Sequence, residues 1–291
     1  MSTALFRGYD RAGLDREYDN RVKVPGFDFA AFQRQCEQAS AEARQKFDCV
    51  LDVPYGSAPA EKLDIFKAKR RNAPVHVFIH GGYWRMLDKK DFSYVASGLV
   101  PHDVTTVVLN YALIPTVNMD ELVAQCRRAV QWVIRNIAEY GGDPQAISVS
   151  GHSAGGHLVA MLLAEPAKGQ LGHASGSDFT HACAISGIFE LEPISLCFLN
   201  DILNLQPQEI KDNSPRFLKR EQWCPLTVAV GAQEGDEYLR QSSDFVQAWT
   251  GNADQPRLLV LPGQDHFSIR AQLGEPDSEM VQLVLGGDIN S

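Results

Sequence analysis

The stretch ISVSGHSAGGHLVAMLLA, from Ile147 to Ala164, decides how this chain of 291 residues is interpreted. A short apolar, β-branched run leads into Gly151-His152-Ser153-Ala154-Gly155, and a small-residue, leucine-rich run follows. The first run is typical of a buried strand and the second of a helix. Gly-x-Ser-x-Gly at such a junction predicts a nucleophile elbow, a very tight turn that exposes the serine Oγ at the carboxyl edge of a sheet. Ser153 is therefore the candidate nucleophile.

Strand-like and helix-like runs alternate along the chain on both sides of this elbow. Helical patterns cover 30–47, 119–142, 153–164, 238–249 and 278–285. The strand candidates are short runs rich in apolar residues, namely FDCVLDVPYG, KLDIF, VHVFIH, VTTVVLN, AISVSG, HACAISG, PLTVAVG and RLLVLPG. This alternation predicts an α/β fold with a mostly parallel, eight-stranded sheet and helices on both faces.

One catalytic domain with a helical N-terminal segment is the simplest partition of the chain. Residues 1–46 are rich in charge and helix formers and contain no strand-like run, so we expect a helical segment that contributes a lid or cap. Residues 47–291 then form the catalytic domain. The stretch 188–223 is less periodic and carries Pro193, Pro207 and Pro215, which predicts an insertion above the sheet.

Charge and cysteine usage narrow the class of protein. A net charge of −9 argues against nucleic acid or an anionic membrane as the main partner. None of the six cysteines forms a C-x-x-C pair, no apolar leader opens the chain, and no apolar run is long enough to span a bilayer. We therefore expect a soluble, cytoplasmic protein. No metal-site motif such as H-E-x-x-H occurs, so no metal is expected. The oligomeric state stays open, with a homodimer as one alternative.

A second chemical signal lies upstream, where His80-Gly81-Gly82-Tyr83-Trp84 directly follows the strand candidate VHVFI. An acyl-transfer enzyme must stabilise the oxyanion of a tetrahedral intermediate, and backbone N–H groups of a glycine-rich loop can do so together with the N–H after the nucleophile. The predicted donors are Gly81, Gly82 and Ala154. The alternative interpretation is a plain turn between strand and loop. The nucleophile elbow further along the chain favours the oxyanion loop over that alternative.

A serine nucleophile needs a base, and the base needs an orienting acid. In folds that carry a nucleophile elbow, these residues occur along the chain in the order serine, acid, histidine. His266 is the last histidine and lies in GQDHFS, just after RLLVLPG. The acid should follow PLTVAVG, where Glu234 comes first and Asp236 is the alternative. Glu237 is expected to cap the next helix.

These residues resemble the α/β-hydrolase fold and, more narrowly, the kynurenine formamidase (arylformamidase) branch near the hormone-sensitive-lipase-type esterases. The motifs that carry the resemblance are HGGYW, Asn110-Tyr111, GHSAGGH, Glu234 with Gln241-Ser242, and Asp265-His266-Phe267. The resemblance implies a cofactor-free serine hydrolase with Ser153 as nucleophile, His266 as general base and acid, and Glu234 as orienter. Many relatives carry aspartate in place of Glu234, which leaves Asp236 open.

The substrate is the least determined feature. Tyr83 and Trp84 are candidate walls of an acyl pocket that favours a small acyl group, and Phe189 is a candidate lining residue for an aromatic leaving group. Core packing is the alternative for all three. The main hypothesis is a formamidase-like enzyme that cleaves a small aryl formamide or amide. A short-chain carboxylesterase is the second. A non-catalytic binding protein is least favoured, because candidates for the whole triad are present.

Overall fold

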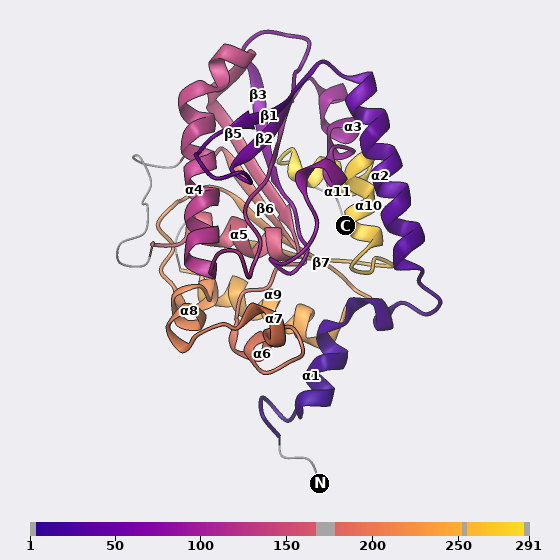
Figure 1. The fold of residues 1–291 in the computed structure, drawn as a ribbon, viewed down its shortest axis with the longest axis vertical. Coiled ribbons are helices and arrows are strands. Elements are labelled where there is room, and N and C mark those ends of the chain that lie inside the picture. Colours follow the sequence, from indigo (N-terminus) through magenta and orange to yellow (C-terminus); the bar gives the residue numbers. More distant parts are fainter. Residues whose placement is uncertain (1–3, 167–177, 252–254, 288–291) are drawn as a thin grey trace.

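The computed structural model describes residues 4–166, 178–251 and 255–287 around one central eight-stranded sheet (Figure 1). The strand order is β1-β2-β4-β3-β5-β6-β7-β8. β1 pairs antiparallel with β2 and β2 with β4, and all other pairs are parallel. The strands are β1 (Cys49–Pro54), β2 (Lys62–Phe66), β3 (Ala73–Ile79), β4 (Thr105–Leu109), β5 (Gly142–His152), β6 (His181–Ile185), β7 (Leu226–Gly231) and β8 (Arg257–Leu261). The predicted sheet is confirmed.

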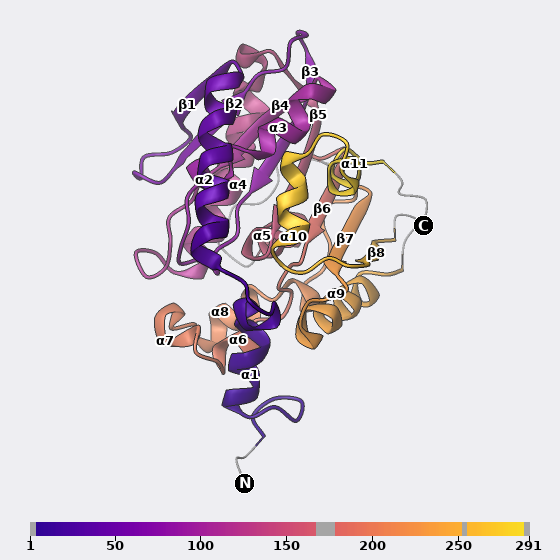
Figure 2. The same ribbon diagram turned by 90° about the vertical axis from the view of Figure 1, so that its right-hand side faces the viewer.

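Helices cover both faces of the sheet, as predicted (Figures 1 and 2). One face carries α4 (Met119–Asn136), α5 (Ala154–Leu163) and α9 (Asp236–Ala248). The other carries α2 (Phe29–Lys46), α3 (Val95–Leu99), α10 (Ser268–Ala271) and α11 (Glu279–Val284). Successive side chains of a strand point to opposite faces, so Val77 joins the first core cluster and its neighbour Phe78 the second. Both are fully buried, and the central strands therefore read as continuous apolar runs.

The chain begins outside this layered structure. α1 (Arg11–Tyr18) starts at the N-cap Asp10, whose carboxylate accepts from the Gly13 N–H, and the 3₁₀ turn η1 (Asn20–Lys23) follows. Figure 2 shows α1 beside α6 (Glu192–Ser195) and below the carboxyl ends of the strands. The proposed boundary between 1–46 and 47–291 stays a prediction, since α2 lies on the sheet while α1 does not.

The predicted insertion 188–223 contains three short helices that the sequence pattern does not predict. They are α6, α7 (Asn200–Leu203) and α8 (Pro207–Asp212), and a 3₁₀ turn η5 (Pro215–Phe217) follows them. Further 3₁₀ turns are η2 (Lys89–Phe92), η3 (Val100–His102), η4 (Ile137–Tyr140) and η6 (Gln272–Gly274). Helices of four to six residues are too short to show a 3.6-residue period.

Ion pairs attach this insertion to α9. Glu190 Oε2 accepts from Arg240 Nη1 at 2.8 Å and from Arg216 Nη1 at 2.7 Å. Glu190 is buried, and the two arginines that bind it come from η5 and α9, so its carboxylate is fixed by two elements.

Among the described helices, none combines the length and the apolar character that crossing a membrane requires.

Candidate active site

Ser153 lies at the junction of β5 and α5 in a strained backbone conformation. Its φ is 59° and its ψ −119°, a region that L-residues rarely adopt. The two glycines of the motif allow this turn to close. A Cβ on Gly151 would lie 2.3 Å from the Gly155 oxygen, and a Cβ on Gly155 would lie 2.0 Å from the Ile79 oxygen. Any larger residue would push the elbow apart.

The glycine-rich loop after β3 packs directly against the elbow. A Cβ on Gly81 would lie 2.7 Å from the His152 carbonyl oxygen, and Gly82 has a φ of +114°. Gly81 and Gly82 both line the cavity that contains Ser153. Ala154 is the first residue of α5, where N–H groups have no acceptor within the helix. The three predicted oxyanion donors thus surround the elbow.

His80 fixes the conformation of this loop. Its ring stacks on Tyr111 with centroids 4.3 Å apart, and its Nδ1 lies 2.8 Å from the Gly81 carbonyl oxygen. In a planar trans peptide the C=O and the next N–H point in opposite directions. A contact that holds the Gly81 carbonyl therefore also sets the direction of the Gly82 N–H. Burial lowers the pKa of His80, and the hydrogen bonds to Gly81 and Asn110 partly oppose that shift.

Glu234 and His266 form a direct contact in the loops after β7 and β8. His266 Nδ1 lies 2.6 Å from Glu234 Oε2, and both side chains are buried. The other carboxylate oxygen accepts from Ser186 Oγ at 2.5 Å and from the Gly231 N–H at 2.8 Å. The carboxylate is thereby held from three sides. Asp236, the alternative acid, is exposed at the first position of α9.

The expected capping role of Glu237 is wrong. Gly235 is the N-cap of α9, and the side chain that accepts from a first-turn N–H is that of Glu17, which binds the Glu237 N–H at 3.3 Å. Glu237 is buried instead, where its carboxylate accepts from the Tyr18 hydroxyl at 2.8 Å and from Arg240 Nε at 2.7 Å. Tyr18 and Glu237 are 219 residues apart in the sequence, so no local sequence pattern predicts their contact.

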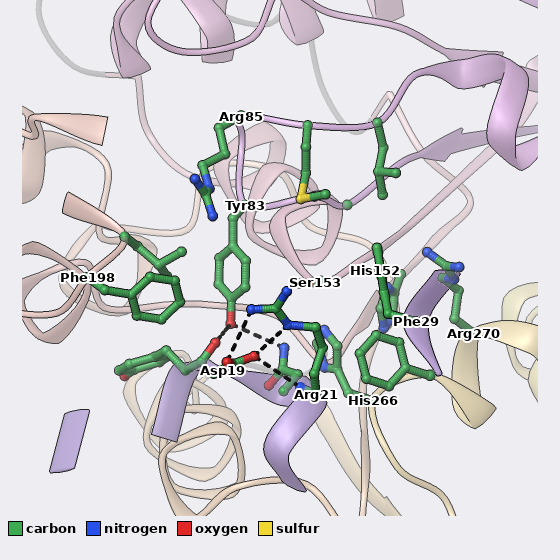
Figure 3. Close-up of a pocket in the computed structure, with 18 residues that line it drawn as sticks. Asp19, Arg21, Phe29, Tyr83, Arg85, His152, Ser153, Phe198, His266 and Arg270 are labelled. Atoms are coloured by element: carbon green, nitrogen blue, oxygen red, sulfur yellow. Dashed lines mark hydrogen bonds and ion pairs between the residues drawn. The ribbon is translucent and has the colours of Figure 1, made fainter. Parts of the chain in front are cut away.

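Two of the three predicted pocket aromatics do not line the cavity. Trp84 is fully buried, and its Nε1 donates to His157 Nδ1 at 3.1 Å. Phe189 is also fully buried and stacks on Phe245 with ring centroids 4.2 Å apart. Both belong to the core, as the alternative interpretation had it. Tyr83 does line the cavity, and so does Phe198 (Figure 3).

A cluster of hydroxyl and amide groups beside Ser153 was missed in the sequence. The Tyr83 hydroxyl donates to the Tyr18 carbonyl oxygen at 2.6 Å and lies 2.7 Å from the Tyr238 hydroxyl. Asn20 Nδ2 donates to the Tyr238 hydroxyl at 3.1 Å. Burial raises the pKa of Tyr238, while its hydrogen bonds with Tyr83, Asn20 and Ser153 oppose that shift. Tyr238 therefore meets the candidate nucleophile as a neutral phenol.

The cavity has a volume of about 750 Å³, its open mouth included. Residues 18–21 of the N-terminal segment line it together with the elbow, His266 and the glycine loop. His152 also lines it, with its ring centroid 4.6 Å from that of His266. Burial holds the pKa of His152 well below its usual range, so this ring is neutral. No group of three or more metal-ligating side chains occurs in the described parts of the chain.

Comparisons with known proteins agree with this architecture. A family model described as BD-FAE matches residues 63–219. Kynurenine formamidase from Salmo salar is 32% identical over 86% of this chain and 85% of its own length. The Danio rerio kynurenine formamidase is 31% identical over 86% and 85%. A candidate thioesterase from Silicibacter sp. TM1040, known as a crystal structure, superposes with a TM-score of 0.83 at 27% identity and covers 94% of this chain and 98% of its own.

The similarity to the two fish enzymes extends over most of each chain and includes the elbow and the glycine loop. It is supported by the sheet order and by a superposition that spans nearly the whole molecule. The chain belongs to the kynurenine formamidase family of α/β-hydrolases, near the hormone-sensitive-lipase-type esterases, and is an enzyme that hydrolyses amide or ester bonds.

Proposed function

We propose that this enzyme hydrolyses a small aryl formamide through a covalent acyl-enzyme, with Ser153 as nucleophile, His266 as general base and acid, and Glu234 as orienter. The observation that carries the proposal is the 2.6 Å contact of the buried Glu234 Oε2 with Nδ1 of His266, which lines the same cavity as Ser153. With Nδ1 held by the carboxylate, Nε2 is the nitrogen that can accept a proton.

The proposed reaction has two halves. In acylation, Ser153 Oγ attacks the formyl carbon while His266 accepts its proton, and the oxyanion binds to the N–H groups of Gly81, Gly82 and Ala154. His266 then protonates the leaving aryl amine. In deacylation, water attacks the formyl ester in the same way and releases formate. Removing one oxyanion donor typically costs about 3–4 kcal/mol of transition-state stabilisation.

The N-terminal segment is proposed to restrict the site to small substrates. Tyr18, Asp19, Asn20 and Arg21 line the cavity opposite the glycine loop, and Figure 3 shows Arg21 in front of Ser153. This position fits the lid or cap expected of residues 1–46. A cytoplasmic location and a homodimer stay predictions.

The test compares kcat/KM for N-formyl-L-kynurenine with that for p-nitrophenyl acetate on one enzyme preparation. The ester is intrinsically far easier to cleave, so a formamide that matches or exceeds it reports specific binding of that leaving group. That result is expected. Turnover of the ester alone would replace the proposal by the second candidate, a short-chain carboxylesterase, which the esterase relatives favour.

A further inference from the structure

The cavity carries a positive charge that the reaction proposed above does not use. Among the described residues that line it, three are arginines and one is an acid, namely Arg21, Arg85, Arg270 and Asp19. The chain as a whole has a net charge of −9. A local excess of guanidinium groups in an acidic protein attracts anions to this opening.

Two of these arginines already have partners. Arg21 forms a two-pronged pair with Asp19, with Nε at 2.8 Å from Oδ1 and Nη2 at 3.1 Å from Oδ2 (Figure 3). Arg270 is buried between aromatic rings, with its guanidinium carbon 4.7 Å from the Phe32 centroid and 5.0 Å from that of Phe92. The fork of Arg21 is thus occupied. Arg270 donates through Nη2 to Cys36 Sγ at 3.3 Å, and although its Nε has no hydrogen-bond partner, the rings enclose its guanidinium.

Arg85 differs from Arg21 in having no acid partner and from Arg270 in being half-buried rather than buried. Across residues 4–166, 178–251 and 255–287, no carboxylate pairs with its guanidinium, and its buried Nε has no hydrogen-bond partner. Its backbone N–H donates to the Gly82 carbonyl oxygen at 3.1 Å, which ties Arg85 to the oxyanion loop. Figure 3 shows its side chain directed into the space beside Tyr83 and Phe198. A buried donor without an acceptor is costly, and a planar guanidinium matches a carboxylate in two hydrogen bonds.

We propose that Arg85 binds a carboxylate group of the substrate. The proposal rests on the proposed hydrolase function and names a residue that sets its specificity. Asp19, the one carboxylate among the described lining residues, is already bound by Arg21 and does not compete for Arg85. A substrate that carries a carboxylate therefore fits this part of the cavity best.

The test uses the 3- and 4-acetoxybenzoates and the acetoxybenzamides of the same substitution, which match in size and in the acetyl group transferred and differ in the charge of the ring substituent. The wild-type enzyme is expected to show a kcat/KM for at least one benzoate about 10- to 100-fold above that of its benzamide. Arg85→Gln should remove this preference, so that the ratio of the two kcat/KM values falls to about one. Arg85→Lys should keep part of it, since lysine retains the charge without the fork.

A matched control removes one positive charge elsewhere. Arg135 is exposed in the last turn of α4, so Arg135→Gln changes the net charge equally and should keep the full benzoate preference. The proposal would be overturned if Arg85→Gln preferred the benzoates as strongly as the wild-type enzyme does, or if the wild-type enzyme showed no preference. A binding measurement distinguishes this failure from failure of the hydrolase function. In a Ser153→Ala background, calorimetry should show benzoate binding more tightly than benzamide, and Arg85→Gln should abolish the difference even if no ester or formamide is ever cleaved.

Discussion

The elbow and the N-terminal cover, residues 10–23, meet at the same cavity, but polar contacts have a larger share in the cover. The elbow rests on fully buried apolar residues of β5 and α5 such as Val149 and Leu158. The cover buries Leu14 and Tyr18 and adds long-range polar contacts, namely the hydrogen bonds of Tyr18 to Glu237 and of Asn20 to Tyr238. A close-packed core fixes atoms more strictly than single hydrogen bonds, which contribute about 0.5–1.5 kcal/mol each. Changes in the elbow should therefore act on chemistry, and changes in the cover on binding.

The largest effect is expected from Ser153→Ala. This substitution removes the proposed nucleophile and should lower kcat by roughly 10⁴- to 10⁶-fold, while thermal unfolding followed by circular dichroism stays close to that of the wild-type enzyme. Activity within tenfold of wild type, measured after active-site titration to exclude contamination, would move the nucleophile away from the elbow.

The next effect separates the two candidate acids. Glu234→Gln should lower kcat by about 10⁴-fold, because an amide no longer holds His266 in the required tautomer. Asp236→Asn is the matched control and should change kcat by less than about twofold, since Asp236 is exposed on α9. Steady-state kinetics on one ester decides between them, and the reverse order of effects would assign the orienting role to Asp236.

A smaller effect is expected in the cover. Asn20→Ala removes the hydrogen bonds to the hydroxyl groups of Tyr83 and Tyr238. Loss of about 1–2 kcal/mol should raise KM by roughly 5- to 30-fold and leave kcat within about threefold. Asn136→Ala, at the end of α4, serves as the control with unchanged KM. If kcat fell as far as in Glu234→Gln, the cover would belong to the chemistry and the contrast with the elbow would fail.

The smallest effect is expected at the outer edge of the cover. Arg11 and Asp201 pair at 2.7 Å, with 51% and 63% of their side chains exposed. Exposed pairs contribute at most about 1 kcal/mol. Arg11→Ala should therefore lower the free energy of unfolding in urea by no more than that, with a smaller loss at high salt. A loss well above 2 kcal/mol would show that the cover is part of the cooperative core.

The sequence predicts features that depend on neighbouring residues and misses contacts between distant segments. The elbow, the glycine loop and the eight strands can each be predicted from a short run of residues, because a tight turn and a buried strand require particular residue types within about ten positions. The contacts of Asn20 with Tyr238 and of Tyr18 with Glu237 join segments more than 200 residues apart and leave no such mark. Tyr238 follows the acid loop by one helical turn, so the topology alone could have placed it near His266.

Aromatic residues show the other limit of sequence interpretation. Tyr83 and Trp84 are neighbours, yet one lines the cavity and the other is fully buried against His157. Phe189 and Phe198 divide in the same way. Hydrophobic character is identical for a core side chain and a pocket side chain, so only the packing of the whole molecule separates them.

The cover is one continuous piece of chain that precedes every strand of the sheet, and this has a consequence for engineering. Four successive residues, Tyr18 to Arg21, form one wall of the cavity without contributing a strand to the sheet. Exchanging the first two dozen residues for those of a relative would replace that wall in a single cloning step, with every strand register left intact. Substrate range can thus be varied by libraries confined to one short continuous segment.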